Sequence, residues 1–125
     1  MHQSLEEKKK LYWELKTGAE SGWDYSSRWF SNKSNTKKDT IESLKDIKPR
    51  SIIPVDLNSI LATNARIISQ YYQDYFSDKE RGSKYKDIAD NLKDSIENVL
   101  WNDEEGIWFD YDLNEGHQRR QFSLR

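Results

Sequence analysis

One acidic residue, Asp24, stands in a strongly aromatic stretch of the sequence, between Trp23 and Tyr25 and close to Trp29. If these rings bury the carboxyl group, burial disfavours its charged form and raises its pKa. A carboxylic acid that stays protonated near neutral pH can donate its proton to a leaving oxygen. Aromatic rings also offer flat apolar faces on which sugars stack. The residue types around Asp24 therefore indicate the acid of a sugar hydrolase.

The same residues allow a purely structural interpretation. Asp24 could cap a short helix that includes Ser26 and Ser27, because Asp is a preferred helix cap. Arg28 could pair with Glu20, which precedes Asp24 by one helical turn. From these residues alone, both interpretations remain open.

A second acidic pair, Asp110 and Asp112, lies on one face of an expected strand beside Trp108. An Asp-x-Asp pair can hold a metal ion, but hard cations need several oxygen ligands and no third ligand is nearby. We expect these carboxylates to be solvated or to stabilise a hairpin. Since the chain has no Cys and two His, it lacks the ligands of thiolate or histidine-rich metal sites. No glycine-rich phosphate loop or nucleophile elbow is present.

The composition bounds the class of protein. With 125 residues, the chain is one domain at most. Its formal net charge of -2 and pI near 5.7 give no electrostatic attraction to nucleic acid. No apolar run is long enough to span a membrane, and residues 1–7 contain no apolar core of a signal peptide. We expect no nucleic-acid partner and no membrane segment in this chain.

Aromatic residues make up 13% of the chain, with five Trp and seven Tyr, although its mean hydropathy is -1.06. A disordered tail does not carry so many large rings. The aromatic excess beside few aliphatic residues is typical of a segment taken from a larger fold. We see no internal repeat, linker or low-complexity stretch.

The first part of the chain predicts one helix and a long connection. A capping-box pattern at Ser4 and Glu7 opens a helix over residues 5–17, with Gly18 near its end. Residues 20–30 have neither helical nor strand periodicity and suit a structured loop. Residues 31–51 indicate an exposed connection, with a short helix near residues 40–47, since Pro49 disfavours helix at the residue before it.

The second part predicts a helical pair and a hairpin. Asp56 is the expected N-cap of a helix whose apolar residues recur at helical spacing: Leu57, Ile60, Leu61, Asn64, Ile67, Ile68, Tyr71 and Tyr75. After a break at Gly82 and Ser83, a second helix ends near residues 100–101, and the two should pack antiparallel. Residues 107–113 alternate as a strand, residues 114–116 form a turn, and residues 118–122 return as its partner.

Three motifs carry a family resemblance. Residues 20–29 read Glu-Ser-Gly-Trp-Asp-Tyr-Ser-Ser-Arg-Trp, which resembles a segment of trehalases, the family 37 glycoside hydrolases, with Tyr25 where Phe is usual. Residues 53–58, Ile-Pro-Val-Asp-Leu-Asn, resemble the next motif of that family. Residues 100–103 and 108–113 resemble the third. Their order and spacing agree with the family over nearly the whole chain.

The resemblance implies a fold and a chemistry. Residues 1–125 would be part of one trehalase-like catalytic domain: mainly α, a partial (α/α)6 toroid, with a C-terminal β-hairpin. Trehalases hydrolyse α,α-trehalose to two glucoses with inversion and use no metal or organic cofactor. Asp24 matches the family's general acid, and Gly22 matches a backbone position that contacts the substrate. Trp23 is a further expected substrate-binding residue, and Tyr25, Arg28 and Trp29 are expected to line the pocket.

The resemblance also implies what this chain lacks. The family's catalytic base is a Glu in a Gly-rich segment after the position of Arg125, and its sugar-binding arginines precede Met1. Neither long family signature occurs here, and residues 123–125 depart from the family pattern. We therefore expect the isolated chain to be inactive. A non-enzymatic truncated product or a helical interaction fragment is the alternative, and another inverting α/α hydrolase, such as a glucosidase, is a third.

Overall fold

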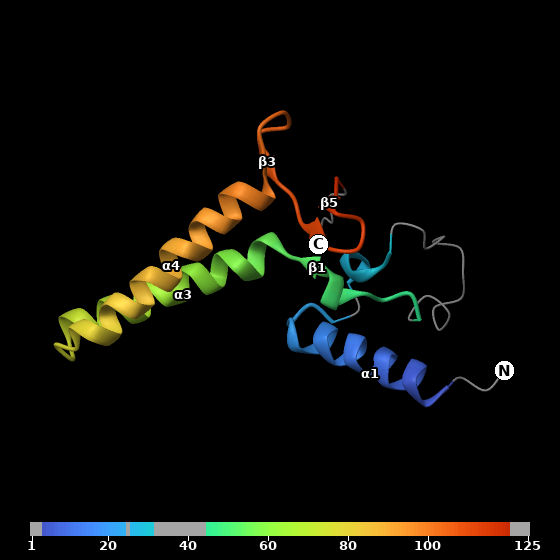
Figure 1. Cartoon of the computed structure of the whole chain (residues 1–125), viewed down its shortest axis with the longest axis horizontal. Helices are drawn as coiled ribbons and strands as arrows, with labels where there is room; N and C mark the ends of the chain where they lie inside the picture. The colour runs from blue at the N-terminus through green and yellow to red at the C-terminus, as the bar shows by residue number, and fades with distance from the viewer. Residues whose placement is uncertain (1–3, 25, 32–44, 121–125) are drawn as a thin grey trace. The chain divides into compact units, whose positions relative to one another are not determined.

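A computed structural model describes residues 4–24, 26–31 and 45–120 of the chain (Figure 1). The chain divides into two compact units, a first unit up to Ile52 and a second unit over Ile53–Arg120. The described residues are mainly helical, with short strands after the last helix. The prediction of a mainly α chain with a C-terminal β-hairpin is therefore confirmed.

The first unit begins with helix α1, Leu5–Glu20. The predicted capping box is present, because Glu7 N–H donates to Ser4 Oγ (3.2 Å) and Ser4 N–H donates to Glu7 Oε2 (2.8 Å). The helix continues past Gly18, which was expected to end it. Gly18 is instead buried inside the helix, where its bare backbone faces Ile47 and Pro49.

The core of the first unit forms around Trp29, which lies in the 3-10 helix η1, Ser27–Trp29. Ile47 and Ile52 are buried with it, and four partly buried residues pack around them: Leu11, Leu15, Trp23 and Phe30. Residues 20–30 are therefore a structured loop, as predicted.

The segment after this loop differs from its prediction as an exposed connection. Ile47 pairs with Phe30 in an isolated β-bridge and is buried. Pro49 is buried in the 3-10 helix η2, Pro49–Ser51. The apolar side chains of this polar-looking stretch complete the core of the unit, which local composition does not show. The rest of the expected connection, residues 32–44, including most of the short helix expected near residues 40–47, lies outside the described residues.

The second unit is built on a helical hairpin. Helix α3, Val55–Asp74, and helix α4, Lys79–Leu100, lie side by side and run in opposite directions, as predicted (Figure 1). The chain reverses at residues 75–78, where Ser77 has a φ of 52°. The predicted break at Gly82 is wrong, because Gly82 is buried within α4.

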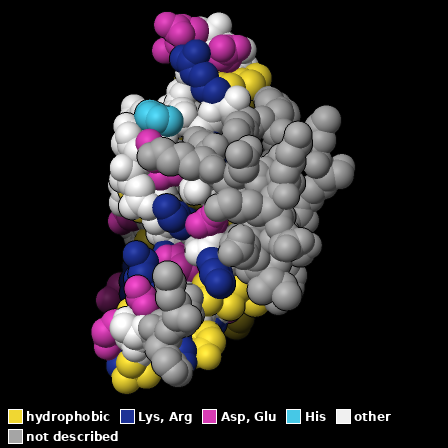
Figure 2. All heavy atoms as spheres, turned by 90° about the vertical axis from the view of Figure 1, so that its right-hand side faces the viewer, with side chains coloured by type: hydrophobic (Ala, Val, Ile, Leu, Met, Phe, Trp, Pro, Cys, Tyr) yellow, Lys and Arg dark blue, Asp and Glu magenta, His cyan; other side chains and the backbone are white. Residues whose placement is uncertain are grey.

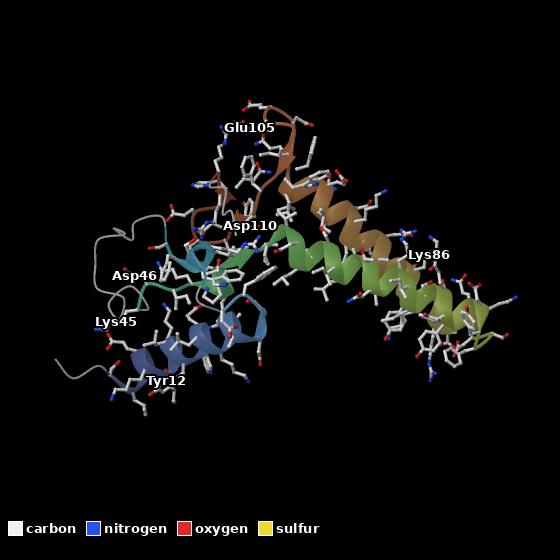
Figure 3. All side chains as sticks on the ribbon, turned by 180° about the vertical axis from the view of Figure 1, so that it is seen from behind. Tyr12, Lys45, Asp46, Lys86, Glu105 and Asp110 are labelled. Carbon is white, nitrogen blue, oxygen red and sulfur yellow. The ribbon has the colours of Figure 1, made fainter. Side chains whose placement is uncertain are left out.

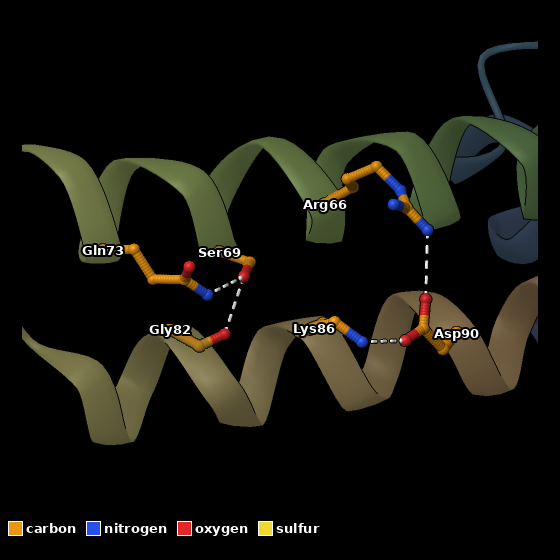
Figure 4. A network of polar contacts seen from close by, with 6 residues as sticks. All are labelled: Arg66, Ser69, Gln73, Gly82, Lys86 and Asp90. Carbon is orange, nitrogen blue, oxygen red and sulfur yellow. Dashed lines mark hydrogen bonds and ion pairs between the residues drawn. The ribbon is translucent and has the colours of Figure 1, made fainter.

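The seam between α3 and α4 is made by small residues. Ala65 and Ser69 of α3 are buried, as are Gly82 and Ala89 of α4. Ser69 Oγ donates a hydrogen bond to the Gly82 carbonyl oxygen (2.7 Å), so the helices approach closely here (Figure 4). Much of the predicted apolar stripe of α3 lies off the seam and remains exposed: Ile60, Leu61, Ile67, Ile68, Tyr71 and Tyr75.

Short strands follow α4 as two hairpins. Strand β2, Trp101–Asn102, pairs antiparallel with β3, Ile107–Trp108, and β4, Tyr111–Asp112, pairs antiparallel with β5, His117–Gln118. The further strand β1, Ile52–Ile53, lies where the two units meet in the sequence. The predicted turn at residues 114–116 is confirmed, and residues 121–122 of the expected return strand lie outside the described residues.

The single strand predicted over residues 107–113 is wrong. Phe109 interrupts the ladder because its side chain is buried and its N–H donates to the Leu100 carbonyl oxygen (2.8 Å). The chain therefore leaves one hairpin and enters a second.

The two hairpins repeat one another at an interval of ten residues. Gly106 and Gly116 both have positive φ, at 67° and 72°. Each donates its N–H to the carbonyl oxygen of the residue four positions earlier, Asn102 or Asp112, at 2.8 Å in both cases. The expectation of no internal repeat is therefore wrong at this short range, where an Asn or Asp and a Glu-Gly pair recur.

The described surface mixes charge types and apolar groups. On the face shown in Figure 2, Lys and Arg side chains lie among Asp and Glu side chains, and hydrophobic side chains lie open beside them. Within the described ranges, none of the helices has both the length and the apolar content that a membrane crossing requires.

Candidate active site

The loop that carries Asp24 begins with a tight turn at the end of α1. Ser21 Oγ donates to the Gly18 carbonyl oxygen (2.6 Å) and accepts the N–H of Trp23 (3.0 Å). Gly22 lies between them with a φ of 74°, a conformation that other residues adopt only at a cost. Among the residues that the structure describes, none would lie within 4 Å of a Cβ at Gly22. The backbone at this position is therefore open to an approaching group.

The far end of the loop is held by Trp29. Its indole Nε1–H donates to the Trp23 carbonyl oxygen (2.8 Å). Its ring is 1% exposed. Its own carbonyl oxygen accepts the N–H of Lys48 (2.8 Å). The loop is thus tied both to its own first turn and to the segment that completes the core.

Asp24 lies in a turn of this loop and is exposed. The expectation that aromatic rings bury its carboxyl group is wrong for the described residues, because Trp23 and Trp29 pack into the core of the first unit instead. The alternative of a helix cap is also not met at η1, whose N-cap is Ser26, with Ser26 Oγ accepting the Arg28 N–H (3.3 Å). Asp24 therefore faces outward from a braced loop.

The other expected site residues have different environments. Trp23 is half-buried against the core, and Gly22 is exposed. The guanidinium carbon of Arg28 lies 5.6 Å from the centre of the Trp29 ring. Glu20 pairs with Lys16 at 3.5 Å. Tyr25 lies outside the described residues.

Glu14 was not expected to contribute, but it binds the segment that packs against the loop. Its carboxylate is buried, and Oε2 accepts the N–H of Arg50 (3.1 Å). The Arg50 guanidinium carbon lies 5.3 Å from the centre of the Trp13 ring. One signal was available: Glu14 shares a helix face with Leu11, Leu15 and Gly18.

The start of α3 is capped from a distant part of the chain. Asp56 was the predicted N-cap, but the N-cap residue is Pro54, which has no side chain that can accept a hydrogen bond. Asp110, labelled in Figure 3, accepts the Val55 N–H at Oδ1 (2.9 Å). Asp56 Oδ1 accepts the Leu57 N–H (2.8 Å) within the first turn. A helix start needs such acceptors, and a residue far along the sequence supplies one here.

Asp112 stabilises its hairpin, as expected. Its Oδ1 accepts the N–H groups of Asn114 (2.9 Å) and Glu115 (3.2 Å), and Oδ2 lies 3.8 Å from Arg119 Nη1. Among the residues that the structure describes, no three His, Cys, Asp or Glu side chains form a group that could hold a metal ion.

The second unit contains an apolar hollow of about 180 Å³. Its lining contains no ionisable side chain: Ile53, Asn58, Leu92, Ser95, Ile96, Val99 and Leu100. This hollow therefore offers no acid or base chemistry.

The chain is similar to known trehalases. The family model described as Trehalase matches residues 1–125. The trehalase of Apis mellifera is 46% identical over 121 residues, which cover 94% of this chain and 18% of that protein. The trehalase of Pimpla hypochondriaca is 41% identical over 116 residues, 93% of this chain and 19% of that protein. Human trehalase is 36% identical over 116 residues, with the same two shares. The chain thus spans about a fifth of the length of these relatives.

Proposed function

The chain belongs to the trehalase family, and from this premise we propose that it supplies the general acid for the hydrolysis of α,α-trehalose to two glucoses. Asp24 is that acid. Gly22 and Trp23 contact the sugar, and Arg28 and Tyr25 line the pocket. Trp29, which was also expected to line it, is 1% exposed and packs in the core of the first unit instead. The observation that carries the proposal is the exposed Asp24 carboxyl group, which projects from a loop fixed at both ends.

The proposed reaction is a single displacement with inversion. Asp24 donates its proton to the interglycosidic oxygen while the bond from that oxygen to one anomeric carbon breaks, so that one glucose leaves. A water molecule attacks the same carbon from the opposite face, and a second carboxylate accepts its proton. One trehalose and one water give one α-glucose and one β-glucose. The second carboxylate comes from a part of the family's catalytic domain that this chain does not include.

The local geometry supports the role of Asp24. An acid must reach an oxygen of the substrate, which an exposed carboxyl group on the surface of the unit can do. The open backbone at Gly22 allows a sugar to approach beside it.

The direct test uses a chimera in which residues 1–125 replace the matched segment of the Apis mellifera trehalase. Asp24→Asn should lower kcat for trehalose by roughly 10²–10⁴-fold, because the amide cannot donate the proton. Asp94→Asn, at an exposed position on α4, is the matched control and should leave kcat unchanged. A folded chimera without activity, or an Asp24→Asn chimera with full activity, would contradict the proposal.

The stereochemistry gives an independent check. Proton NMR of the first turnovers of the chimera should show α- and β-glucose appearing in equal amounts before mutarotation. Release of α-glucose alone would indicate retention and exclude the displacement described above.

A non-enzymatic interaction role is the second candidate. The observation that favours it is the exposed apolar stripe of α3. The two candidates differ in outcome: an interaction fragment predicts no activity in the chimera, whereas the proposed function predicts activity that depends on Asp24.

A further inference from the structure

We propose that Trp29 is a positioning residue for Asp24, acting through the peptide bond that joins Trp23 to Asp24. This inference rests on the proposed function, because it concerns the same acid. Its elements are a buried indole, one hydrogen bond and a rigid peptide plane.

The hydrogen bond reaches the backbone directly before the acid. Trp29 Nε1–H donates to the Trp23 carbonyl oxygen at 2.8 Å. That carbonyl belongs to the same planar peptide group as the Asp24 nitrogen, and the peptide bond does not rotate freely. Fixing the oxygen therefore fixes the direction in which the chain enters Asp24.

The donor itself is held firmly. The Trp29 side chain is 1% exposed and packs with Ile47 and Ile52. The backbone of Trp29 is also bound: its backbone N–H donates to the Ser26 carbonyl oxygen (3.1 Å), and its carbonyl oxygen accepts the Lys48 N–H (2.8 Å). An indole packed in this way has little freedom to follow a moving loop.

The segment that packs against the indole, residues 47–51, is also held by a hydrogen bond. The segment that carries Ile47 and Lys48 continues into η2, where the Arg50 N–H is bound by the buried Glu14 carboxylate (3.1 Å). This connects the indole to α1, the helix that precedes the loop. The indole that donates to Trp23 is thus held by the packing of Ile47 and Ile52 and, through η2, by α1.

The opposite side of Trp23 is bound as well. Its N–H donates to Ser21 Oγ at 3.0 Å. Both backbone polar groups of Trp23 are therefore committed, and the freedom left to the acid lies within Asp24 itself. A misplacement of about 1 Å in a reacting group can cost roughly 10²-fold in rate, so this bracing bears directly on proton transfer.

The test is Trp29→Phe in the chimera, since Phe keeps an aromatic ring and lacks the N–H. We expect kcat for trehalose to fall about 10- to 100-fold with KM changed by less than about threefold. With α-glucosyl fluoride, whose leaving group needs little protonation, the loss should be below about threefold. Trp13→Phe, at an exposed ring of the same unit, is the matched control and should change neither substrate.

A merely structural role gives a different result. Loss of a buried hydrogen bond alone would lower the melting temperature and reduce activity on both substrates equally, and that outcome would overturn the inference. The Trp23 carbonyl oxygen also accepts the Ser26 N–H (3.3 Å), which both variants retain. Ser21→Ala removes the acceptor of the Trp23 N–H without touching the core. It should also slow trehalose more than the fluoride, and an equal effect on the two substrates would overturn the inference even where Trp29→Phe fails to fold.

The two proposals can fail separately. If Asp24→Asn abolishes trehalose hydrolysis while Trp29→Phe leaves the ratio of the two substrates unchanged, only the positioning role is lost. If Asp24→Asn is fully active, the proposed function fails with it.

Discussion

Gly18 and Gly22 lie four residues apart, one inside α1 and one after its end, and meet different structural requirements. Gly18 has helical geometry and packs against Ile47 and Pro49, with room for a methyl group at 3.7 and 3.8 Å from them. At Gly22 no described atom lies within 4 Å of a Cβ position, but the residue has a φ of 74°. Space is thus available at both positions, and the backbone conformation alone distinguishes them.

The two glycines should therefore respond oppositely to alanine. Gly18→Ala should stabilise the fold by about 0.5–1 kcal/mol, because glycine weakens a helix interior by that amount. Gly22→Ala should destabilise it by about 1 kcal/mol, because a side chain opposes positive φ. Urea unfolding of the two variants measures both values, and equal effects would contradict this account.

The ion pairs on the helical hairpin make one titration measurable. Lys86 Nζ donates to Asp90 Oδ2 (2.6 Å), which lowers the pKa of Asp90 and raises that of Lys86, and Arg66 Nη2 binds Asp90 Oδ1 (3.0 Å) (Figure 4). The stabilisation from Asp90 is present above about pH 4, its ordinary value, and is lost as the pH falls through the lowered pKa. The contribution of Lys86 is lost only as the pH rises through its raised pKa, above about 10.4.

Carboxyl NMR of the purified chain should show Asp90 titrating below about pH 3.9, the ordinary value for Asp. In Lys86→Met, the pKa of Asp90 should move back toward that value. Identical titration curves for the two proteins would show that the hydrogen bond does not control Asp90.

At the residue scale, the sequence identifies the acid loop but not its supports. The motif around Asp24 is readable because ten adjacent residues carry it. Glu14 and Asp110 act on backbone N–H groups at Arg50 and Val55, far away in the sequence. No local pattern encodes which amide a carboxylate will meet. The exposure of Asp24 was likewise not readable, since neighbours in sequence need not surround one another in space.

The seam of the helical hairpin depends on the absence of a side chain at Gly82. A Cβ there would lie 2.5 Å from Gln73 Cγ, and Gln73 Nε2 also donates to Ser69 Oγ (3.1 Å). Ser69 Oγ in turn binds the Gly82 carbonyl oxygen. Close approach and hydrogen bonding therefore occur at the same place and fix the register of α3 on α4.

Gly82→Ala should destabilise the hairpin by about 1–3 kcal/mol, the usual cost of overpacking, despite the better helix propensity of alanine. Adding Gln73→Ala should restore most of the loss, because it removes the atom that collides. Thermal unfolding of the single and double variants forms the required cycle. If Gln73→Ala gives no recovery, the collision is not the cause.

At the element scale, helices were easier to predict than their ends. The apolar periodicity predicts both long helices, but the boundary between them was placed at Gly82. This glycine lies inside α4 and allows α3 to pack closely against it. The strand over residues 107–113 failed because the burial of Phe109 outweighs local alternation. In both cases a tertiary contact overrides the local signal.

The described part of the chain leaves many large apolar side chains exposed, several of them on α3. Ile60, Leu61 and Tyr71 of α3 are 50%, 55% and 53% exposed. The (α/α)6 toroid itself stays a prediction.

The purified chain should consequently self-associate through α3. Size-exclusion chromatography with light scattering should detect species larger than 14.9 kDa, and Ile60→Glu with Ile67→Glu should shift them toward monomer. A matched pair of substitutions, Thr63→Glu and Gln70→Glu at exposed polar positions of α3, should not. A sharp monomer peak for the unchanged chain would contradict this prediction.

The purified chain should also release no glucose from trehalose, because it carries the proposed acid without the second carboxylate. Each catalytic group is worth roughly 10²–10⁴-fold in rate. A coupled glucose assay against the active chimera sets the scale. Turnover by the 125-residue chain within tenfold of the chimera would show that the chemistry needs nothing further.

The cap that Asp110 places on Val55 has a consequence for the order of folding. The two residues are 55 positions apart, and the entropy lost in closing such a long loop is recovered only after α3 and α4 have zipped together. The hydrogen bond that completes the first turn of α3 therefore forms late in the folding of the second unit. During synthesis on the ribosome, the Val55 N–H gains this acceptor only after Asp110 has emerged.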